Sequence, residues 1–367
     1  MEMKKFNWCG LVIDQQRVGA GSEHQIVLSQ IKKRKLRDII GVIKDQASLI
    51  KANLSIQRTV SSIQVAVIRA TTHASGSPPR NHLISAIISA GDHSLPAIYA
   101  CNEAIMDRLH RTHNSYVTLK CLFIFHNIMA KGSLLYKDHV SFFPSSGGHN
   151  SLNLSGFYDK SDVETRQLSS WVRWYANVLE SNMITSRALG SYISPSSRLS
   201  INFDKIENYK ENIVFSNFIT EIKSLVCMVE GICEAPESQY CQKIDLVHEI
   251  MILVAEDYRS TQYHIMIRLV EFAGRVSILS YLDLSELILC LTSLEGCRKK
   301  LNELFIRRKN DLFWEMVSQK KMEMEKLKYE RERQSFLLWN VDENSDELTW
   351  SSQRLLFAAA YKSMGDM

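Results

Sequence analysis

Residues 67–87 read VIRATTHASGSPPRNHLISAI and place a sharp corner between two apolar stretches. The corner contains Gly76, Pro78 and Pro79, which continue a helix poorly because glycine is conformationally free and proline lacks a backbone N–H. We therefore expect one helix to end near Thr72 and the next to begin at the second proline or one residue later. The stretch predicts two helices joined by a tight, irregular corner.

Cationic and imidazole side chains flank this corner on both sides. Arg69 and His73 precede it, and Arg80 and His82 follow it. The first N–H groups of a helix have no partner inside the helix and favour phosphate, and basic side chains can converge on the same anion. Two interpretations fit the pattern: a solvated loop that carries charges, or a binding site for a negatively charged group.

The rest of the chain follows the helical period. Apolar residues recur at i, i+3 and i+4, alternation with period two is rare, and the six prolines fall between apolar stretches. The clearest helices are a largely buried one over 117–129 and amphipathic ones over 168–179 and 244–258. Asp283 and Ser285 are candidate caps of a later helix. The pattern predicts an all-α protein of about ten helices.

Composition indicates a soluble protein of the cytosol. Apolar residues make up 45% and charged residues 23% of the 367 residues, as in ordinary globular proteins. No apolar run reaches the roughly 18 residues that a membrane span needs. Near the N-terminus the apolar stretch is broken by Asp14, which does not suit a secretion signal.

The eight cysteines fit a reducing compartment. Cys101, Cys121, Cys227 and Cys290 each lie in an apolar segment, where a reduced thiol behaves as a small hydrophobe. No C-x-x-C pair occurs. We expect free, metal-free cysteines and no cofactor.

Positive charge is concentrated in two stretches, although the net charge is only +4. Residues 32–37 read KKRKLR, and 298–333 carries an excess of basic residues with signs that alternate as on a solvated helix. Such patches suit lipid headgroups or nucleic acid. No P-loop, nucleophile elbow or H-E-x-x-H pair is present. We therefore expect no catalytic residue and predict that the protein is not an enzyme.

Several of these stretches together resemble one family. VIRATTH at 67–73 with PPRNHL at 78–83 resembles the signature of ANTH domains, which occur in clathrin assembly proteins. Further similar segments are KLRDIIGVIKDQASLIKANLS at 35–55, YVTLKCLFIFHNIMAKGS at 116–133, LNLSGFYDKS at 152–161 and WVRWYANVL at 171–179. Their order and spacing cover roughly residues 36–310.

The resemblance implies an ENTH/ANTH-type helical solenoid without enzymatic activity. Family members bind phosphatidylinositol 4,5-bisphosphate on the cytoplasmic face of membranes, promote clathrin assembly in endocytosis and vesicle budding, and in some cases hold vesicle SNAREs. The implied locations are coated pits, cytoplasmic vesicles and the Golgi apparatus. Carried over position by position, the implied headgroup-binding residues are Arg69, Arg80 and His82, with His73, Lys44 and Lys51 beside them.

This chain departs from the family pattern at the corner. The family usually has two or three basic residues there, whereas here Pro78, Pro79 and Asn81 surround Arg80. Losing one or two such contacts costs about 1–2 kcal/mol of headgroup binding. Lys44, Lys51 and the basic stretch at 32–37 are expected to compensate.

The matched segments also set the expected organisation of the chain. We expect an N-terminal segment at 1–35 that is disordered or amphipathic, an ANTH-like domain at 36–310, a charged helical extension at 311–335 and an acidic, aromatic tail at 336–367. In the extension, Asp311, Leu312 and Phe313 match the D-L-[LF] clathrin-binding tripeptide.

Two other functions fit the same sequence. One is a helical protein-interaction scaffold that holds SNAREs with weakened lipid binding. The other is nucleic-acid binding through 32–37 and 298–333, which would depend steeply on salt. The adaptor interpretation expects no nucleic acid among the partners.

Overall fold

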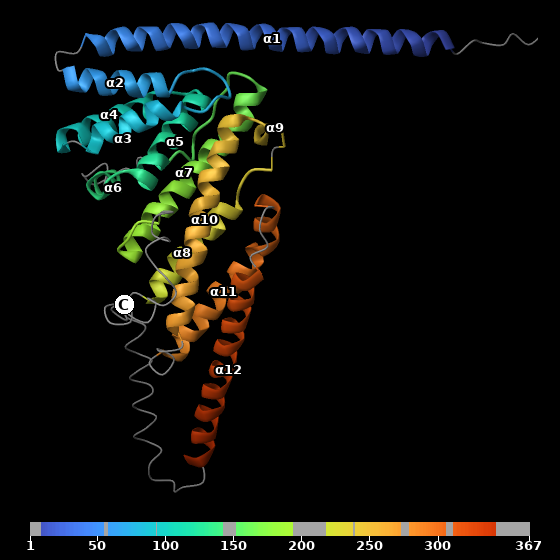
Figure 1. Ribbon diagram of the computed structural model, residues 1–367. Coiled ribbons are helices and arrows are strands. Elements are labelled where there is room, and N and C mark those ends of the chain that lie inside the picture. Colours follow the sequence, from blue (N-terminus) through green and yellow to red (C-terminus); the bar gives the residue numbers. More distant parts are fainter. Residues whose placement is uncertain are drawn as a thin grey trace, which may run out of the picture.

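The computed structural model describes residues 9–54, 58–92, 94–141, 152–193, 218–237, 239–272, 279–305 and 311–342, and of these it leaves undescribed the side chains of 9–30, 58, 59, 141, 239, 240, 311 and 335–342. These residues form twelve helices and no strand (Figure 1), which confirms the all-α prediction. The helices are α1 (Cys9–Asn53), α2 (Arg58–Ala70), α3 (Asn81–Asp92), α4 (Leu95–Arg111), α5 (Ser115–Lys131), α6 (Leu134–Ser141), α7 (Val163–Leu189), α8 (Phe218–Cys233), α9 (Gln239–Gln242), α10 (Asp245–Phe272), α11 (Tyr281–Leu304) and α12 (Asp311–Asp342).

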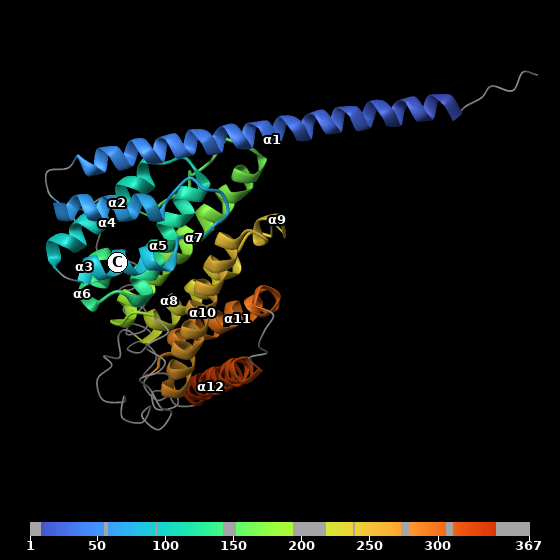
Figure 2. The same cartoon turned by 45° about the horizontal axis from the view of Figure 1, so that its top comes forward.

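The helices stack in sequence order along one direction. In Figures 1 and 2, α1 lies across one end of the molecule and α12 forms the other. Between them α1 packs on α2, α2 on α3 and α4, α5 on α7, α7 on α8, α8 on α11, and α11 on α12. This arrangement is the helical solenoid that the sequence predicted.

Helix α5 forms the centre of the core. Every residue from Ser115 to Met129 is buried, because α5 is covered by α3, α4, α7 and α10. The side chain of Asn114 caps its first turn, and the N–H of Gly132 bonds to the last turn. The buried helix predicted over 117–129 is therefore confirmed.

Three details differ from the expectations. The cap of α11 is Ser280, which forms a capping box with Asp283, while Ser285 lies inside the helix and donates to the carbonyl of Tyr281. Cys227 is exposed rather than buried, because it lies on the outer face of α8.

Helix α1 crosses residue 35 without a break, and α12 runs from Asp311 through residue 335 to Asp342. The first eight residues and the tail from 343 lie outside the described part. No helix in the described ranges is long and apolar enough to span a membrane.

Candidate functional site

The predicted corner lies between α2 and α3. Helix α2 ends at Ala70, where the hydroxyl of Thr71 bonds back to the carbonyl of Val67 at 2.7 Å. Gly76 adopts a positive φ of 74°, a conformation that other residues rarely take. At the start of α3, the backbone N–H groups of Leu83 and Ile84 donate to the carbonyl of Arg80. The two helix ends lie within two residues of the positions predicted from the sequence.

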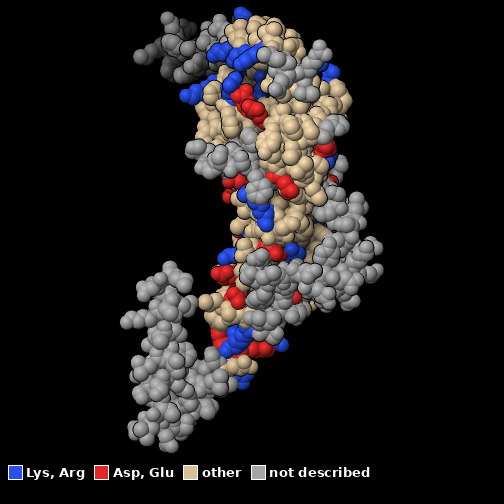
Figure 3. Space-filling view, turned by 90° about the vertical axis from the view of Figure 1, so that its left-hand side faces the viewer, with Lys and Arg blue, Asp and Glu red and all other residues tan. Residues whose placement is uncertain are grey.

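Five of the predicted binding residues reach the surface. The side chains of Arg69, Arg80 and His82 are exposed at the corner, and those of Lys44 and Lys51 are exposed on α1, which packs against α2. On the face shown in Figure 3, Lys and Arg side chains gather at the end of the molecule that carries α1 and α2. Their convergence on a single anion stays a prediction.

His73 takes a different position. Its ring Nδ1 lies 2.7 Å from Oδ1 of Asp45 on α1, and its backbone N–H donates to Oδ2 of the same carboxylate at 2.8 Å. Only 13% of the His73 side chain is exposed. His73 therefore ties the corner to α1, and this contact competes with any role for the ring as a headgroup ligand.

Arg108 completes this largely buried cluster from α4. Its Nη2 donates to Asp45 at 2.7 Å and to the carbonyl of Thr71 at 2.8 Å. Burial opposes ionisation of Asp45, but hydrogen bonds from His73 and Arg108 outweigh it, so the pKa of Asp45 lies below its ordinary value. One carboxylate thus joins α1, the corner and α4.

Lys120 of α5 bonds the next part of the corner backbone. Its ammonium group donates to the carbonyls of Thr72 and Ala74 at 2.9 and 2.8 Å. Burial in α5 lowers the pKa of Lys120 to about 8. Because Lys120 and Arg108 both bond the corner backbone, the exposed cations beside it are carried on a fixed frame. We call Asp45, His73, Arg108 and Lys120 the corner brace.

Sequence reasoning missed Asp45 and Arg108 as members of the brace. A weak signal existed for Asp45, which follows Gly41 by four residues and precedes Ala52 by seven, so the three share a helical face. Gly41 fits that face because a Cβ there would lie 2.5 Å from Cβ of His73. Nothing in the sequence around Arg108 indicates its partner.

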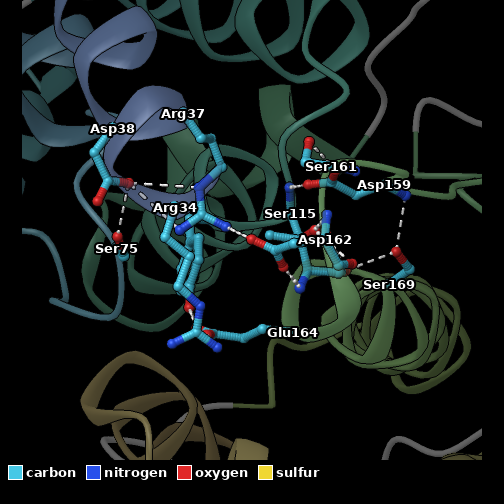
Figure 4. Close-up of polar contacts among 12 residues, drawn as sticks. Arg34, Arg37, Asp38, Ser75, Ser115, Asp159, Ser161, Asp162, Glu164 and Ser169 are labelled. Atoms are coloured by element: carbon cyan, nitrogen blue, oxygen red, sulfur yellow. Dashed lines mark hydrogen bonds and ion pairs between the residues drawn. The ribbon is translucent and has the colours of Figure 1, made fainter. Parts of the chain in front are cut away.

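A polar pocket of about 500 Å³ lies on the other side of the corner. It is bordered by α1, by Ser75, Gly76 and Ser77, and by the first turns of α7 and α10. Figure 4 shows two arginines of α1 reaching across to α7. Arg34 pairs with Glu164 at 2.7 Å, and Arg37 pairs with Asp162, the cap residue of α7.

Comparison with known proteins identifies the family. The ANTH domain matches residues 62–192, which include most of α2, the corner and all of α3 to α7. "Putative clathrin assembly protein At4g40080" of Arabidopsis thaliana is 39% identical over 287 residues, covering 76% of this chain and 78% of the relative. The chain belongs to the ANTH-domain clathrin assembly protein family.

Two further Arabidopsis thaliana relatives carry the same kind of name. "Putative clathrin assembly protein At5g10410" is 33% identical over 303 residues, which cover 78% of this chain and 86% of the relative. "Putative clathrin assembly protein At5g65370" is 28% identical over 304 residues, 78% of this chain and 99% of the relative. The similarity therefore extends well beyond the residues that match the ANTH domain.

The motif at 116–133 that resembles the family is structural in this member. Lys120 belongs to the corner brace. His126 lies in the core, where its Nδ1 is 2.9 Å from the hydroxyl of Tyr175 on α7 and its Nε2 is 3.0 Å from Asp257 on α10. The two residues link α5 to the corner and to the neighbouring layers.

The clathrin-like tripeptide lies in the first turn of α12. Leu312 is 80% exposed, but Phe313 is 3% exposed and its ring packs edge-on against Trp314. Asp311 begins the helix. In this conformation the phenyl ring is not available to a partner, so the tripeptide could act as a clathrin motif only after the first turn of α12 opens.

Proposed function

We propose that this protein is a non-enzymatic adaptor that binds phosphatidylinositol 4,5-bisphosphate through the α2–α3 corner and promotes clathrin assembly on membranes. The observation that carries the proposal is the braced corner with Arg69, Arg80 and His82 exposed around it. Cations on a fixed frame bind an anion with less loss of conformational entropy than cations on a flexible loop. The clathrin part rests on the family and on the names of the relatives.

Helix α1 supports the membrane part independently. Its inner face carries Gly41, Asp45 and Ala52, which are buried. Its outer face carries large apolar side chains that are 58–77% exposed: Leu36, Ile39, Ile43, Ile50 and Leu54. An apolar face flanked by lysines suits the boundary between headgroups and acyl chains.

The charges around that face favour an anionic membrane. Lys44 and Lys51 are exposed on one flank of α1, and Lys32, Lys33 and Lys35 are exposed toward its N-terminal part. Each basic residue near an anionic leaflet contributes on the order of 1 kcal/mol. In this proposal, lysines of α1 replace the one or two basic residues that the corner lacks relative to the family. We infer a peripheral position on the cytoplasmic face of clathrin-coated membranes.

Vesicle sedimentation tests the lipid part. The full chain should sediment with phosphatidylcholine vesicles that contain a few per cent phosphatidylinositol 4,5-bisphosphate, and should stay in solution with phosphatidylcholine alone. Excess RNA should not release it from the vesicles. Equal sedimentation with and without the phosphoinositide would favour the scaffold function. Release from the vesicles by RNA would favour nucleic-acid binding.

Clathrin assembly is tested with purified triskelia. Under buffer conditions in which triskelia stay soluble, the protein should increase the amount of pelletable clathrin cages in proportion to its concentration. An unchanged soluble fraction, with the protein itself absent from preformed cages, would contradict the clathrin part and leave the lipid part standing.

A further inference from the structure

The polar pocket behind the corner contains an accessible hydroxyl beside three cations. Ser75, Gly76 and Ser77 line the pocket together with Arg34 and Arg37 of α1 and with Lys243, just before α10. The loop is fixed against α10, because the N–H of Leu246 donates to the carbonyl of Gly76 at 2.9 Å. The Ser77 side chain is exposed.

Ser77 also has the local sequence and conformation of a kinase substrate. It begins the run Ser77-Pro78-Pro79-Arg80, a serine followed by proline and, two residues later, arginine. Residues 77–80 lie outside both helices. An exposed, non-helical serine with proline next in the chain is the form that proline-directed protein kinases accept.

We propose that Ser77 is a phosphorylation site and that the pocket behind the corner holds its phosphate. A proline-directed kinase would transfer the γ-phosphoryl group of ATP to Oγ of Ser77. The new Oγ–P bond replaces the bond between the γ-phosphorus and the β–γ bridging oxygen. ADP leaves, and the hydroxyl proton passes to the base of the kinase.

The pocket offers cationic hydrogen-bond donors for a phosphate group, although its walls carry equal numbers of cations and carboxylates. Its walls carry Arg34, Arg37 and Lys243, against the carboxylates of Asp38, Glu164 and Asp245. The two guanidinium groups are engaged with Glu164 and with Asp162 and Asp38, yet each has five N–H donors. A phosphoserine carries about −1.5 to −2 charges and three strong acceptor oxygens, so it can add bonds to these groups and to Lys243.

Ser75 is the natural control for Ser77. Its hydroxyl donates to Oδ1 of Asp38 at 3.2 Å, and the next residue is Gly76 rather than proline. The proposal therefore predicts modification of one serine and not of the other, although both line the same pocket.

The phosphorylation site at Ser77 does not depend on the proposed function. The effect of phosphorylation on membrane binding does rest on the proposed function. A dianion three residues before Arg80 lowers the positive potential of the corner. Phosphorylated protein should bind phosphoinositide vesicles several-fold more weakly than the unmodified protein. If unmodified protein fails to bind vesicles, the proposed function fails, whatever happens at Ser77. If both forms bind equally well, only this effect is wrong.

The site is tested by incubating the full chain with a proline-directed kinase and ATP, followed by tryptic mass spectrometry. Cleavage after Arg69 and Arg80 yields the peptide ATTHASGSPPR, in which Ser77 should carry the phosphate. Ser77→Ala should abolish the modification of this peptide, and Ser75→Ala should leave it unchanged. Modification of the isolated peptide but not of the folded chain would overturn the proposal, and so would modification only at Ser75 or a threonine.

Phosphorus NMR tests whether the pocket holds the phosphate. The second pKa of the phosphoserine in the folded protein should lie about 0.5–1 unit below that of the isolated phosphopeptide, because neighbouring cations favour the dianion. Lys243→Gln should raise this pKa part of the way back toward the value of the isolated phosphopeptide, while the circular-dichroism spectrum stays unchanged. Equal pKa values in the protein and the peptide would contradict capture by the pocket.

Discussion

His264 lies in α10 with 7% of its surface exposed, and neither ring nitrogen has a hydrogen-bond partner. Burial and then the neighbouring Arg268 lower its pKa to about 4. The unfolded chain, with an ordinary histidine pKa near 6.5, therefore binds a proton that the folded chain does not between pH 6.5 and 4. Stability falls as the pH drops through that window.

This histidine gives the first prediction. Between pH 7 and pH 5 the wild type should lose about 2 kcal/mol of unfolding free energy through His264, and His264→Leu should lack this component. Urea unfolding at both pH values measures the difference. His248→Leu, at an exposed position of the same helix, is the matched control for removing a histidine from α10. Equal losses of unfolding free energy in the wild type and in His264→Leu would show that His264 does not cause the pH dependence.

Asp45 gives a second prediction among single residues. Asp45→Asn removes the charge that Arg108 and His73 share, and breaking a buried ion pair costs about 3 kcal/mol. Urea unfolding at pH 7 measures the loss. The control is Asp107→Asn, which breaks the exposed pair with Arg111 and should cost less than about 0.5 kcal/mol. Similar losses in both variants would mean that the brace stabilises no more than a surface ion pair.

Among the helices, α1 depends on a close approach to the corner. A Cβ on Gly41 would lie 2.5 Å from Cβ of His73, and His73 is tied to Asp45, so it has little room to move. Gly41→Ala should therefore destabilise the fold by about 1–2 kcal/mol despite the gain in helix propensity. Hydrogen exchange should increase in α1 and in residues 71–76.

Gly296 on α11 provides the matched control. A Cβ there meets nothing within 4 Å, so Gly296→Ala should stabilise the protein by about 0.5–1 kcal/mol through helix propensity alone. Equal stabilisation by both alanine variants would show that α1 does not need its close contact with the corner.

The helices could be predicted from the sequence more fully than the brace. Helix α5 is buried without interruption from Ser115 to Met129, the buried residues of α7 repeat with the helical period, and Gly76 with the proline pair marks the corner, so these signals are local. The bond between Arg108 and Asp45 joins residues 63 positions apart. No periodicity encodes such a pairing, and only the stacking of α1, α2 and α4 brings the two residues together.

At the scale of the whole molecule, exposed cations lie at both ends of the stack, but only one end carries the corner. One end carries α1, the corner and the exposed cations of the proposed membrane site. The other end carries α11 and α12, where Lys299 and Arg333 are exposed. If the corner binds the membrane, charge at the two ends should have unequal effects on lipid binding.

Vesicle binding by charge-reversal variants measures this most directly. Arg69→Glu with Arg80→Glu should weaken binding to phosphatidylinositol 4,5-bisphosphate vesicles by about 30-fold or more, since each cation contributes on the order of 1 kcal/mol. Lys299→Glu with Arg333→Glu, which changes the net charge equally, should bind nearly as the wild type does. Both variants should keep the wild-type melting temperature, because the reversed side chains are exposed. Equal weakening by both pairs, or undiminished binding by the corner variant, would contradict a headgroup site at the α2–α3 corner.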